Sequence, residues 1–194
     1  MVIVNDCEVS SVLGWRFFNI KSSVMNIVQR KFYRGALLAF LLCLGYSGSV
    51  LAVEKGSKAP DFQLAGTQGS VRLSEAAGSV VYLDFWASWC GPCRQSFPWM
   101  NEMQEKYRSK GLKVIAVNVD ARSEDARKFL AQNPAGFTVA FDSKGTTPGQ
   151  YGVKGMPTSF IIGRDGKVVS SHLGFNAAEK ETLEKDLKSA LEAK

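Results

Sequence analysis

The sequence predicts an α/β fold in which one β-sheet lies between helices, a three-layer α/β/α sandwich with an N-terminal β-hairpin extension. The first observation behind this prediction is an alternation. Apolar segments rich in β-branched and aromatic residues alternate with segments whose apolar residues recur every three or four positions. The second is that glycine-containing turns join short strand-like segments at both ends of this series. The predicted order is therefore β-hairpin, β, α, β, α, β-hairpin, α.

The strands are predicted from nearly continuous apolar runs, which are typical of strands covered on both faces. The clearest run is SVVYLDFW (79–86), and KVIAVNVD (113–120) has the same character. FTVAFD (137–142) is either a short strand or an extended link. Two hairpins complete the set: one pairs Phe62–Ala65 with Ser70–Leu73, and TSFIIGRDGKVVSSHLG (158–174) turns at Asp165 and Gly166.

The helices are predicted from apolar periodicity and from residues that start or stop helices. A helix is expected from Cys93 to Arg108, with Gly111 ending it. SEDARKFLAQN predicts a helix capped by Ser123, and TTPGQYGV predicts a single helical turn. The last helix, NAAEKETLEKDLKSALEA, is amphipathic, with leucines spaced four residues apart at Leu183, Leu187 and Leu191.

The first 52 residues have the pattern of an export signal. Basic residues within 30–34 precede an uncharged stretch, 35–53, in which an apolar part is followed by small residues. This order predicts a signal peptide cleaved after Ala52, and Met25 begins a well-proportioned signal, so we expect translation to start there. The alternative is an uncleaved anchor through the uncharged stretch. We expect 53–194 to form one periplasmic domain, either free or tethered to the inner membrane.

The charge of the chain argues against nucleic acid as a partner. The 24 basic and 18 acidic residues give a net charge of +6, and half of this excess lies in the first 52 residues. The rest shows no basic cluster interleaved with aromatic residues. We expect its charges to lie on solvated helix faces.

Cysteine usage narrows the chemistry of Cys90 and Cys93. The other two cysteines, Cys7 and Cys43, lie in the leader. A single bridge that closes so small a loop restricts the unfolded chain very little, so a structural disulfide fits badly. A closed zinc site needs four ligands, and the single histidine, His172, is expected at a surface or strand edge. We predict no metal site, although two-coordinate copper(I) stays open as an alternative.

A redox role fits the position of the pair between a buried strand and a helix. Free backbone N–H groups at the start of a helix stabilise a thiolate, which favours Cys90 as a nucleophile. Cys93 lies one turn later and can resolve the mixed disulfide. Pro92 suits the first helical turn, and Gly91 leaves room for a partner chain. No cofactor is expected beyond the redox-active disulfide.

Two further elements accompany the pair. Asp84 interrupts the apolar strand, and alternation directs it into the interior near the start of the helix. A buried carboxyl there would have a raised pKa and could accept the proton of Cys93. Met156 and Pro157 precede the strand TSFII, where the proline either marks a strand edge or forms a cis turn.

These motifs resemble a known family. DFWASWCGPC is similar to the thioredoxin active site, and GMPTSFII with DGKVV is similar to its cis-proline segment and following hairpin. KAPDFQL and the export signal resemble the TlpA/ResA-like periplasmic thioredoxins, which include cytochrome c maturation reductases. The resemblance implies a thioredoxin-like fold and a cis Pro157 beside the disulfide. It further implies that the main chain of Met156 pairs with substrate, that Trp89 shields the pair, and that Asp84 matches the buried aspartate of thioredoxin.

Two departures from the maturation members are visible. The dipeptide between the cysteines is Gly-Pro rather than Glu-Pro, and Ser96 stands where an acidic residue is frequent. Both weaken an assignment to cytochrome c maturation.

We therefore expect a periplasmic thiol:disulfide oxidoreductase that acts as a disulfide reductase on protein thiols and disulfides. A DsbD-like membrane protein would supply its electrons, because the periplasm is oxidising. The alternatives are a copper(I)-binding chaperone of the same fold, with Met100, Met103 and Met156 as further ligands, and a thiol peroxidase. Against the peroxidase, Ala87 replaces the threonine expected three residues before the nucleophile.

Overall fold

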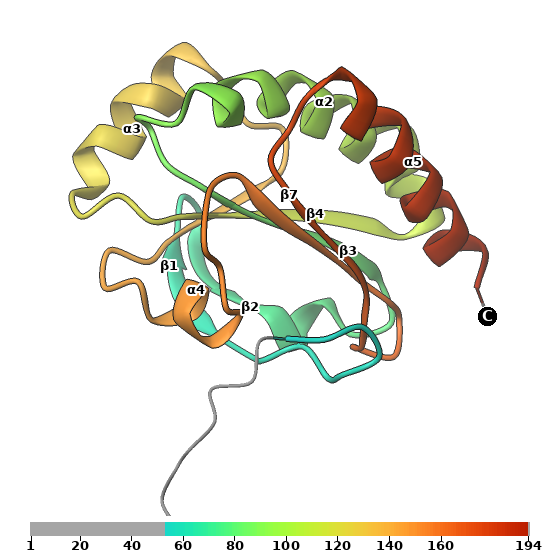
Figure 1. Ribbon diagram of the computed structural model, residues 1–194. Coiled ribbons are helices and arrows are strands. Elements are labelled where there is room, and N and C mark those ends of the chain that lie inside the picture. The colour runs from blue at the N-terminus through green and yellow to red at the C-terminus, as the bar shows by residue number, and fades with distance from the viewer. Residues whose placement is uncertain (1–52, 194) are drawn as a thin grey trace, which may run out of the picture. The chain divides into compact units, whose positions relative to one another are not determined.

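The computed structural model describes residues 53–193, and the predicted leader lies outside this range. Within it, seven strands form one mixed sheet in the order β2-β1-β5-β4-β3-β6-β7 (Figure 1). The strands are β1 Gln63–Gly66, β2 Gly69–Arg72, β3 Val80–Trp86, β4 Leu112–Asn118, β5 Thr138–Phe141, β6 Thr158–Ile162 and β7 Val168–Leu173. The helices are α2 Gly91–Tyr107, α3 Ser123–Gln132, α4 Thr146–Gln150 and α5 Ala177–Glu192, with short 3-10 helices η1 Leu73–Ala76 and η2 Arg108–Lys110.

The centre of the sheet is built from the two apolar runs of the sequence. Strand β3 pairs in parallel with β4 and antiparallel with β6, and all seven of its residues are buried. Strand β5, predicted as a strand or a link, is a strand that pairs in parallel with β4. Burial on both faces explains why β3 and β4 lack a polar face in the sequence.

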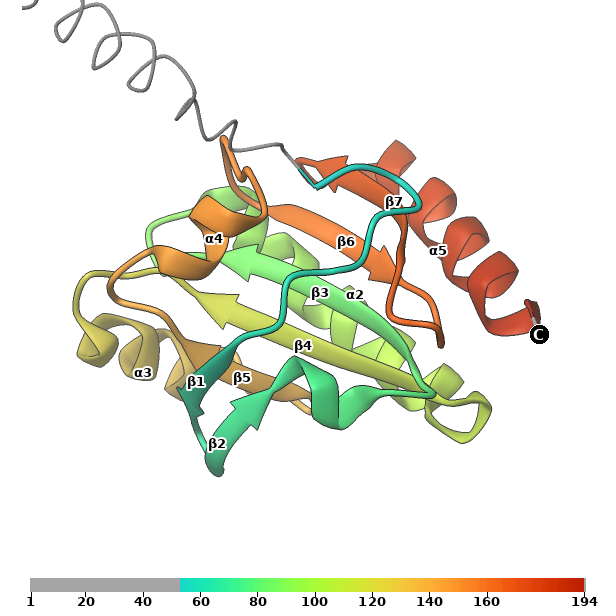
Figure 2. The ribbon, with the colours of Figure 1, turned by 90° about the horizontal axis from the view of Figure 1, so that it is seen from below.

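Helices cover the two faces of the sheet unequally. Helices α2, α3 and α5 lie together on one face, and the short α4 lies on the other (Figure 1; Figure 2). Each face has its own core: Tyr82 and Trp86 of β3 pack with residues of the three long helices, whereas Leu83 and Phe85 pack with η1 and Tyr151 on the opposite side. The three-layer prediction is confirmed, with a thin second helical layer.

Both predicted hairpins are present. The first extends the sheet beyond β5, because β1 pairs antiparallel with both β2 and β5. The second joins β6 to β7 through a turn in which Gly166 has a φ of 76°, a left-handed conformation that glycine adopts without steric cost. The N–H of Gly163 closes this turn on the carbonyl of Lys167 at 2.8 Å.

Two predicted helix starts differ from the structure. Helix α2 begins at Gly91, two residues before the predicted Cys93, because Cys90 already acts as its N-cap. The prediction that Ser123 caps α3 was wrong: Arg122 is the N-cap and makes no side-chain capping bond. Its side chain instead pairs with the carboxylate of Asp125 at 2.8 Å, which places a charge pair over the first turn.

Helices α2 and α5 are tied together at the surface. The carboxylate of Glu184 on α5 accepts hydrogen bonds from Lys106 Nζ at 2.8 Å and from the Tyr107 hydroxyl at 2.6 Å. Beneath this tie, Leu183 and Leu187 are buried against the sheet, as the leucine spacing predicted.

Among residues 53–193, none of the helices combines the length and the apolar content that crossing a bilayer requires.

Candidate active site

Cys90 and Cys93 lie where β3 gives way to α2 and are joined by a disulfide, with 5.3 Å between their Cα atoms. A turn closed by the Cys90 N–H and the carbonyl of Ala87 leads from the strand to the helix. The Sγ of Cys90 accepts the N–H of Cys93 at 3.2 Å. Cys90 is 5% exposed and Cys93 is completely buried. The sulfur of Cys90 therefore occupies the position where the free N–H groups of the helix converge.

The first two residues of α2 leave this end of the helix open to a partner. Gly91 and Pro92 are both exposed. A Cβ added to Gly91 would meet no heavy atom within 4 Å, so the backbone beside the disulfide faces open space. Pro92 lacks an N–H, but a helix makes no use of that donor in its first turn.

The loop before β6 contributes a cis peptide bond between Met156 and Pro157. This decides between the two states that the residue pattern left open, and it agrees with the resemblance. Thr158, which follows, pairs with Phe85 near the end of β3, so this loop lies at the same end of the sheet as the cysteines. Pro157 is buried and Met156 is half-buried.

Asp84 lies in the interior, as predicted, and is 1% exposed. On β3 it shares a face with Tyr82 and Trp86, which belong to the core cluster that also contains both cysteines. Its Oδ2 has no hydrogen-bond partner among the described residues. Burial raises the pKa of this carboxyl well above its usual range. Burial, and next the charge of Asp84, also raise the pKa of Tyr82.

Trp89 and Leu173 are the two large hydrophobic side chains that are exposed in the described part of the chain, at 74% and 66%. Trp89 directly precedes Cys90. Leu173 ends β7, where it pairs with Thr158, and its side chain lies 3.3 Å from the position of a Cβ on Gly155. Trp89 therefore adjoins the disulfide, and Leu173 adjoins the cis-proline loop. The sequence prediction missed Leu173, because only the register of β6 and β7 places it there.

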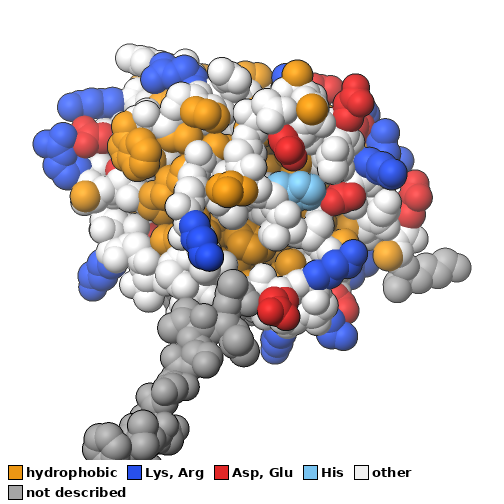
Figure 3. Space-filling model, in the orientation of Figure 1, with side chains coloured by type: hydrophobic (Ala, Val, Ile, Leu, Met, Phe, Trp, Pro, Cys, Tyr) orange, Lys and Arg blue, Asp and Glu red, His pale blue; other side chains and the backbone are white. Residues whose placement is uncertain are grey.

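Residues 53–193 contain no group of three or more His, Cys, Asp or Glu side chains able to hold a metal ion, and His172 lies at the α5 side of β7. Its Nε2 lies 3.1 Å from Asp186, and its Nδ1 lies 3.7 Å from Glu179. Figure 3 shows the histidine between acidic side chains. The residue ties β7 to α5. Met100 and Met103, considered as copper ligands, are buried in the hydrophobic core.

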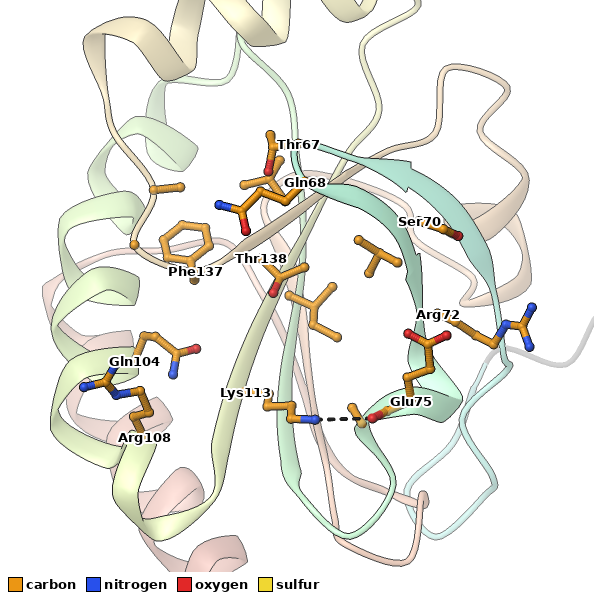
Figure 4. A pocket seen from close by; sticks show the side chains of 16 residues that line it. Thr67, Gln68, Ser70, Arg72, Glu75, Gln104, Arg108, Lys113, Phe137 and Thr138 are labelled. Carbon is orange, nitrogen blue, oxygen red and sulfur yellow. Dashed lines mark hydrogen bonds between the residues drawn. The ribbon is translucent and has the colours of Figure 1, made fainter.

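A cavity of about 650 Å³ lies away from the cysteines (Figure 4). It is bordered by the β1–β2 turn, the end of α2 and the start of β4, where Lys113 Nζ donates to the carbonyl of Glu75 at 3.3 Å. Because β3 and β4 run parallel, this cavity is at the opposite end of the strands from Cys90. Its charged lining residues are all exposed: Arg72, Glu75, Arg108 and Lys113. It has no part in the chemistry of the pair.

Comparison with known proteins agrees with this geometry. Residues 54–190 match the Redoxin family. The thiol-disulfide oxidoreductase ResA of Bacillus cereus (strain ATCC 10987 / NRS 248) is 38% identical over 152 residues, which cover 78% of this chain and 87% of that protein. ResA of Bacillus subtilis (strain 168) is 36% identical over 153 residues, which cover 75% and 86%.

Solved structures show the same fold. A crystal structure from Chlorobium tepidum, provisionally described as the thiol:disulfide interchange protein DsbE, is 66% identical with a TM-score of 0.72, covering 72% of this chain and 99% of that one. The thioredoxin domain of a thiol-disulfide oxidoreductase from Bacteroides vulgatus is 25% identical with a TM-score of 0.63, covering 70% and 99%. The chain therefore belongs to the Redoxin family and is a thiol–disulfide oxidoreductase of the thioredoxin-fold, TlpA/ResA-like group.

Proposed function

We propose that this oxidoreductase is exported and works in the periplasm as a reductant of protein disulfides. The observation that carries the proposal is the site itself. A cysteine pair at a helix N-terminus has a buried carboxyl, Asp84, on the same side of the sheet, and Oδ2 of this carboxyl has no hydrogen-bond partner within residues 53–193. The basic, apolar and small-residue order of 1–52 supports export.

The first step is attack by the Cys90 thiolate on a substrate disulfide. One substrate sulfur forms a mixed disulfide with Cys90, and the other leaves as a thiolate. The N-terminus of α2 stabilises the attacking thiolate, since a free cysteine with a pKa of about 8.5 is mostly protonated at neutral pH. The main chain of Met156, beside the cis bond, is the group that pairs with the substrate backbone.

The second step is resolution by Cys93. Its thiol gives its proton to the carboxylate of Asp84, and the resulting thiolate attacks Sγ of Cys90. The Cys90–Cys93 disulfide forms, the bond between Cys90 and the substrate breaks, and the substrate sulfur that Cys90 held leaves as a thiolate. Two electrons have then passed from the dithiol to the substrate. A carboxyl with a raised pKa suits this role, because it holds a proton more readily than an exposed aspartate does.

The substrate is an extended polypeptide that contains a disulfide. The exposed side chains of Trp89, next to Cys90, and Leu173, next to the cis-proline loop, offer apolar contacts to residues on either side of a substrate cysteine. Reducing equivalents come from a membrane reductase of the DsbD type, because an oxidising compartment does not regenerate the dithiol. Relatives named thiol-disulfide oxidoreductase ResA support this kind of reaction.

Two measurements test the proposal. With Cys93→Ala, the mixed disulfide at Cys90 cannot be resolved, so partners should accumulate in covalent complexes that a thiol reductant releases. Cys90→Ala is the matched control and should trap nothing. Trapping the thiols by alkylation in cells gives the direction of electron flow. A reductant is mostly in the dithiol form, and its cysteine pair becomes oxidised to the disulfide when the membrane donor is deleted. A pair found oxidised in both strains contradicts the reductant assignment.

A further inference from the structure

A second buried carboxylate, Asp120, contacts the segment that carries the nucleophile. Asp120 lies just beyond the end of β4 and is 4% exposed. The N–H of Ser88 donates to both of its oxygens, at 3.2 Å to Oδ1 and 3.0 Å to Oδ2. Ser88 lies two residues before Cys90 and 32 residues before Asp120 in the chain. The contact therefore joins the end of one parallel strand to the loop that follows its neighbour.

Asn118 holds the Asp120 side chain in this position. Its Nδ2 donates to Asp120 Oδ2 at 2.8 Å, and its Oδ1 accepts the N–H of Asp120 at 3.1 Å. Asn118 is itself 1% exposed. Among the described residues, Asp120 takes part in no ion pair with a lysine, arginine or histidine. Within residues 53–193, the hydrogen-bond donors to this buried side chain are therefore amide N–H groups, and none is a cation.

Asp142 offers a comparison within the same sheet. It is also 4% exposed, and it follows β5 as Asp120 follows β4. Its Oδ2 accepts the N–H of Thr147 at 2.6 Å, which fixes the first turn of α4. Asp142 therefore holds a helix on the thin side of the sheet, whereas Asp120 holds the loop from Ala87 to Cys90.

We propose that Asp120 is a positioning residue for thiol–disulfide exchange: its carboxylate fixes the loop that presents Cys90, and its charge raises the pH at which the Cys90 thiol ionises. The first effect follows from the hydrogen bonds, because an amide held at 3.0 Å restricts the backbone two residues before the nucleophile. The second follows from Coulomb repulsion, because Asp120 contacts the backbone two residues before the nucleophile and forms no ion pair within the described residues. Both effects act in either direction of electron flow, so the inference does not depend on the reductant proposal.

Two variants of Asp120 separate the two effects. Asp120→Asn keeps an oxygen that can accept the Ser88 N–H but removes the charge. In the reduced protein, iodoacetamide alkylates Cys90 faster as the pH rises, and Asp120→Asn should shift this increase to lower pH. At pH 6 the variant should therefore react several-fold faster than the unaltered protein. Asp120→Ala removes the acceptor as well. Exchange with a disulfide-bonded protein substrate should slow by about tenfold, because the loop is no longer held.

Asp142→Asn is the matched control, since it alters an equally buried carboxylate whose side chain holds α4 and makes no hydrogen bond to the Ala87–Cys90 loop. It should change neither the alkylation profile nor the exchange rate, whatever it does to thermal stability. The amide resonance of Ser88 in ¹⁵N-labelled protein reports the hydrogen bond directly and should move strongly in Asp120→Ala. The inference is wrong if the Asp120→Asn alkylation profile coincides with that of the unaltered protein. It is equally wrong if Asp120→Ala, measured well below its melting temperature, exchanges as fast as Asp142→Asn.

Discussion

Asp84 and Asp120 are both buried acids near the cysteine pair, yet their surroundings are opposite. Asp84 lies inside β3 with an Oδ2 that has no partner in the described part of the chain, and burial raises its pKa. Asp120 lies beyond the end of β4 and accepts hydrogen bonds from Ser88 and Asn118. An acid without donors is destabilised as an anion and so binds protons, whereas an acid with donors works as a fixed acceptor. This difference in hydrogen bonding indicates that Asp84 transfers a proton and that Asp120 holds the loop before Cys90.

The sharpest test of this comparison is the rate of resolution. Asp84→Asn keeps the shape of the side chain but removes the proton acceptor, so attack by Cys93 on the Cys90 mixed disulfide should slow by about 100-fold at pH 7. The deficit should shrink as the pH rises, because Cys93 then ionises without help. Quenched-flow trapping of the mixed disulfide measures this step. If Asp120→Asn slows resolution as much as Asp84→Asn does, the two carboxylates do not have separate roles.

Stability should respond to Asp84 in the direction opposite to a usual core substitution. Asp84→Ala removes a buried acid whose Oδ2 has no hydrogen-bond partner within residues 53–193, and we expect it to raise the free energy of unfolding at pH 7 by about 1–3 kcal/mol. Because the folded pKa of Asp84 lies above the unfolded value of about 3.9, the folded state binds more protons between the two. The stability of the unaltered protein therefore falls as the pH rises above about 4, and Asp84→Ala should flatten that slope. Urea unfolding of the oxidised protein from pH 4 to 8 measures both effects; a less stable variant at pH 7 would contradict them.

Substitution of Asp120 by alanine should lower the free energy of unfolding, whereas substitution of Asp84 should raise it. Asp120→Ala leaves the Ser88 N–H and the Asn118 amide without their acceptor, and we expect a loss of about 1–3 kcal/mol. Urea unfolding at pH 7 against Asp120→Asn, which retains one acceptor oxygen, isolates the hydrogen-bond contribution. A gain in stability for Asp120→Ala would mean that Asp120, like Asp84, destabilises the fold, and would contradict the prediction.

The fold followed from the sequence where local pattern and tertiary packing agree. The run that forms β3 is apolar because both faces are buried, and the glycine turn between β6 and β7 is local, so both were predictable. The start of α2 was not, because a cysteine that caps its own helix is no recognised cap residue in sequence. The predicted cap Ser123 failed for a similar reason, since the neighbouring arginine occupies that position.

The site was predictable to the extent that its residues are close in sequence. Cys90, Cys93 and Asp84 lie within ten residues. Strand alternation places Asp84 on the face of β3 that packs in the same core cluster as the cysteines. The cis state of Pro157 came from resemblance rather than from residue pattern. Leu173 and Asp120 were missed because their roles depend on pairing across the sheet: β7 brings Leu173 beside Thr158, and the parallel neighbours β3 and β4 bring Asp120 to Ser88.

The smallest expected effect is at a third carboxylate, Glu184, which is neither buried nor near the cysteines. The hydrogen bond from Lys106, and next that from Tyr107, lower its pKa to about 2. A lowered folded pKa stabilises the protein above the unfolded value of 4.5, and this contribution is lost as the pH falls toward 2. Because the side chain is partly exposed, solvent screens the pair, and Glu184→Gln should lower the melting temperature at pH 7 by at most about 3 °C.

The control for Glu184 is Glu181→Gln on the same helix, since Glu181 is exposed and forms no ion pair within residues 53–193. Thermal unfolding at pH 7 and at pH 2.5 should show a difference between the two variants that nearly closes at the lower pH. A difference that persists at pH 2.5 would mean that the loss comes from side-chain packing at the α2–α5 contact. Neither Glu184→Gln nor Glu181→Gln should alter the rate of resolution by Cys93. A carboxyl influences that step only where it is buried and can take up the proton of the thiol.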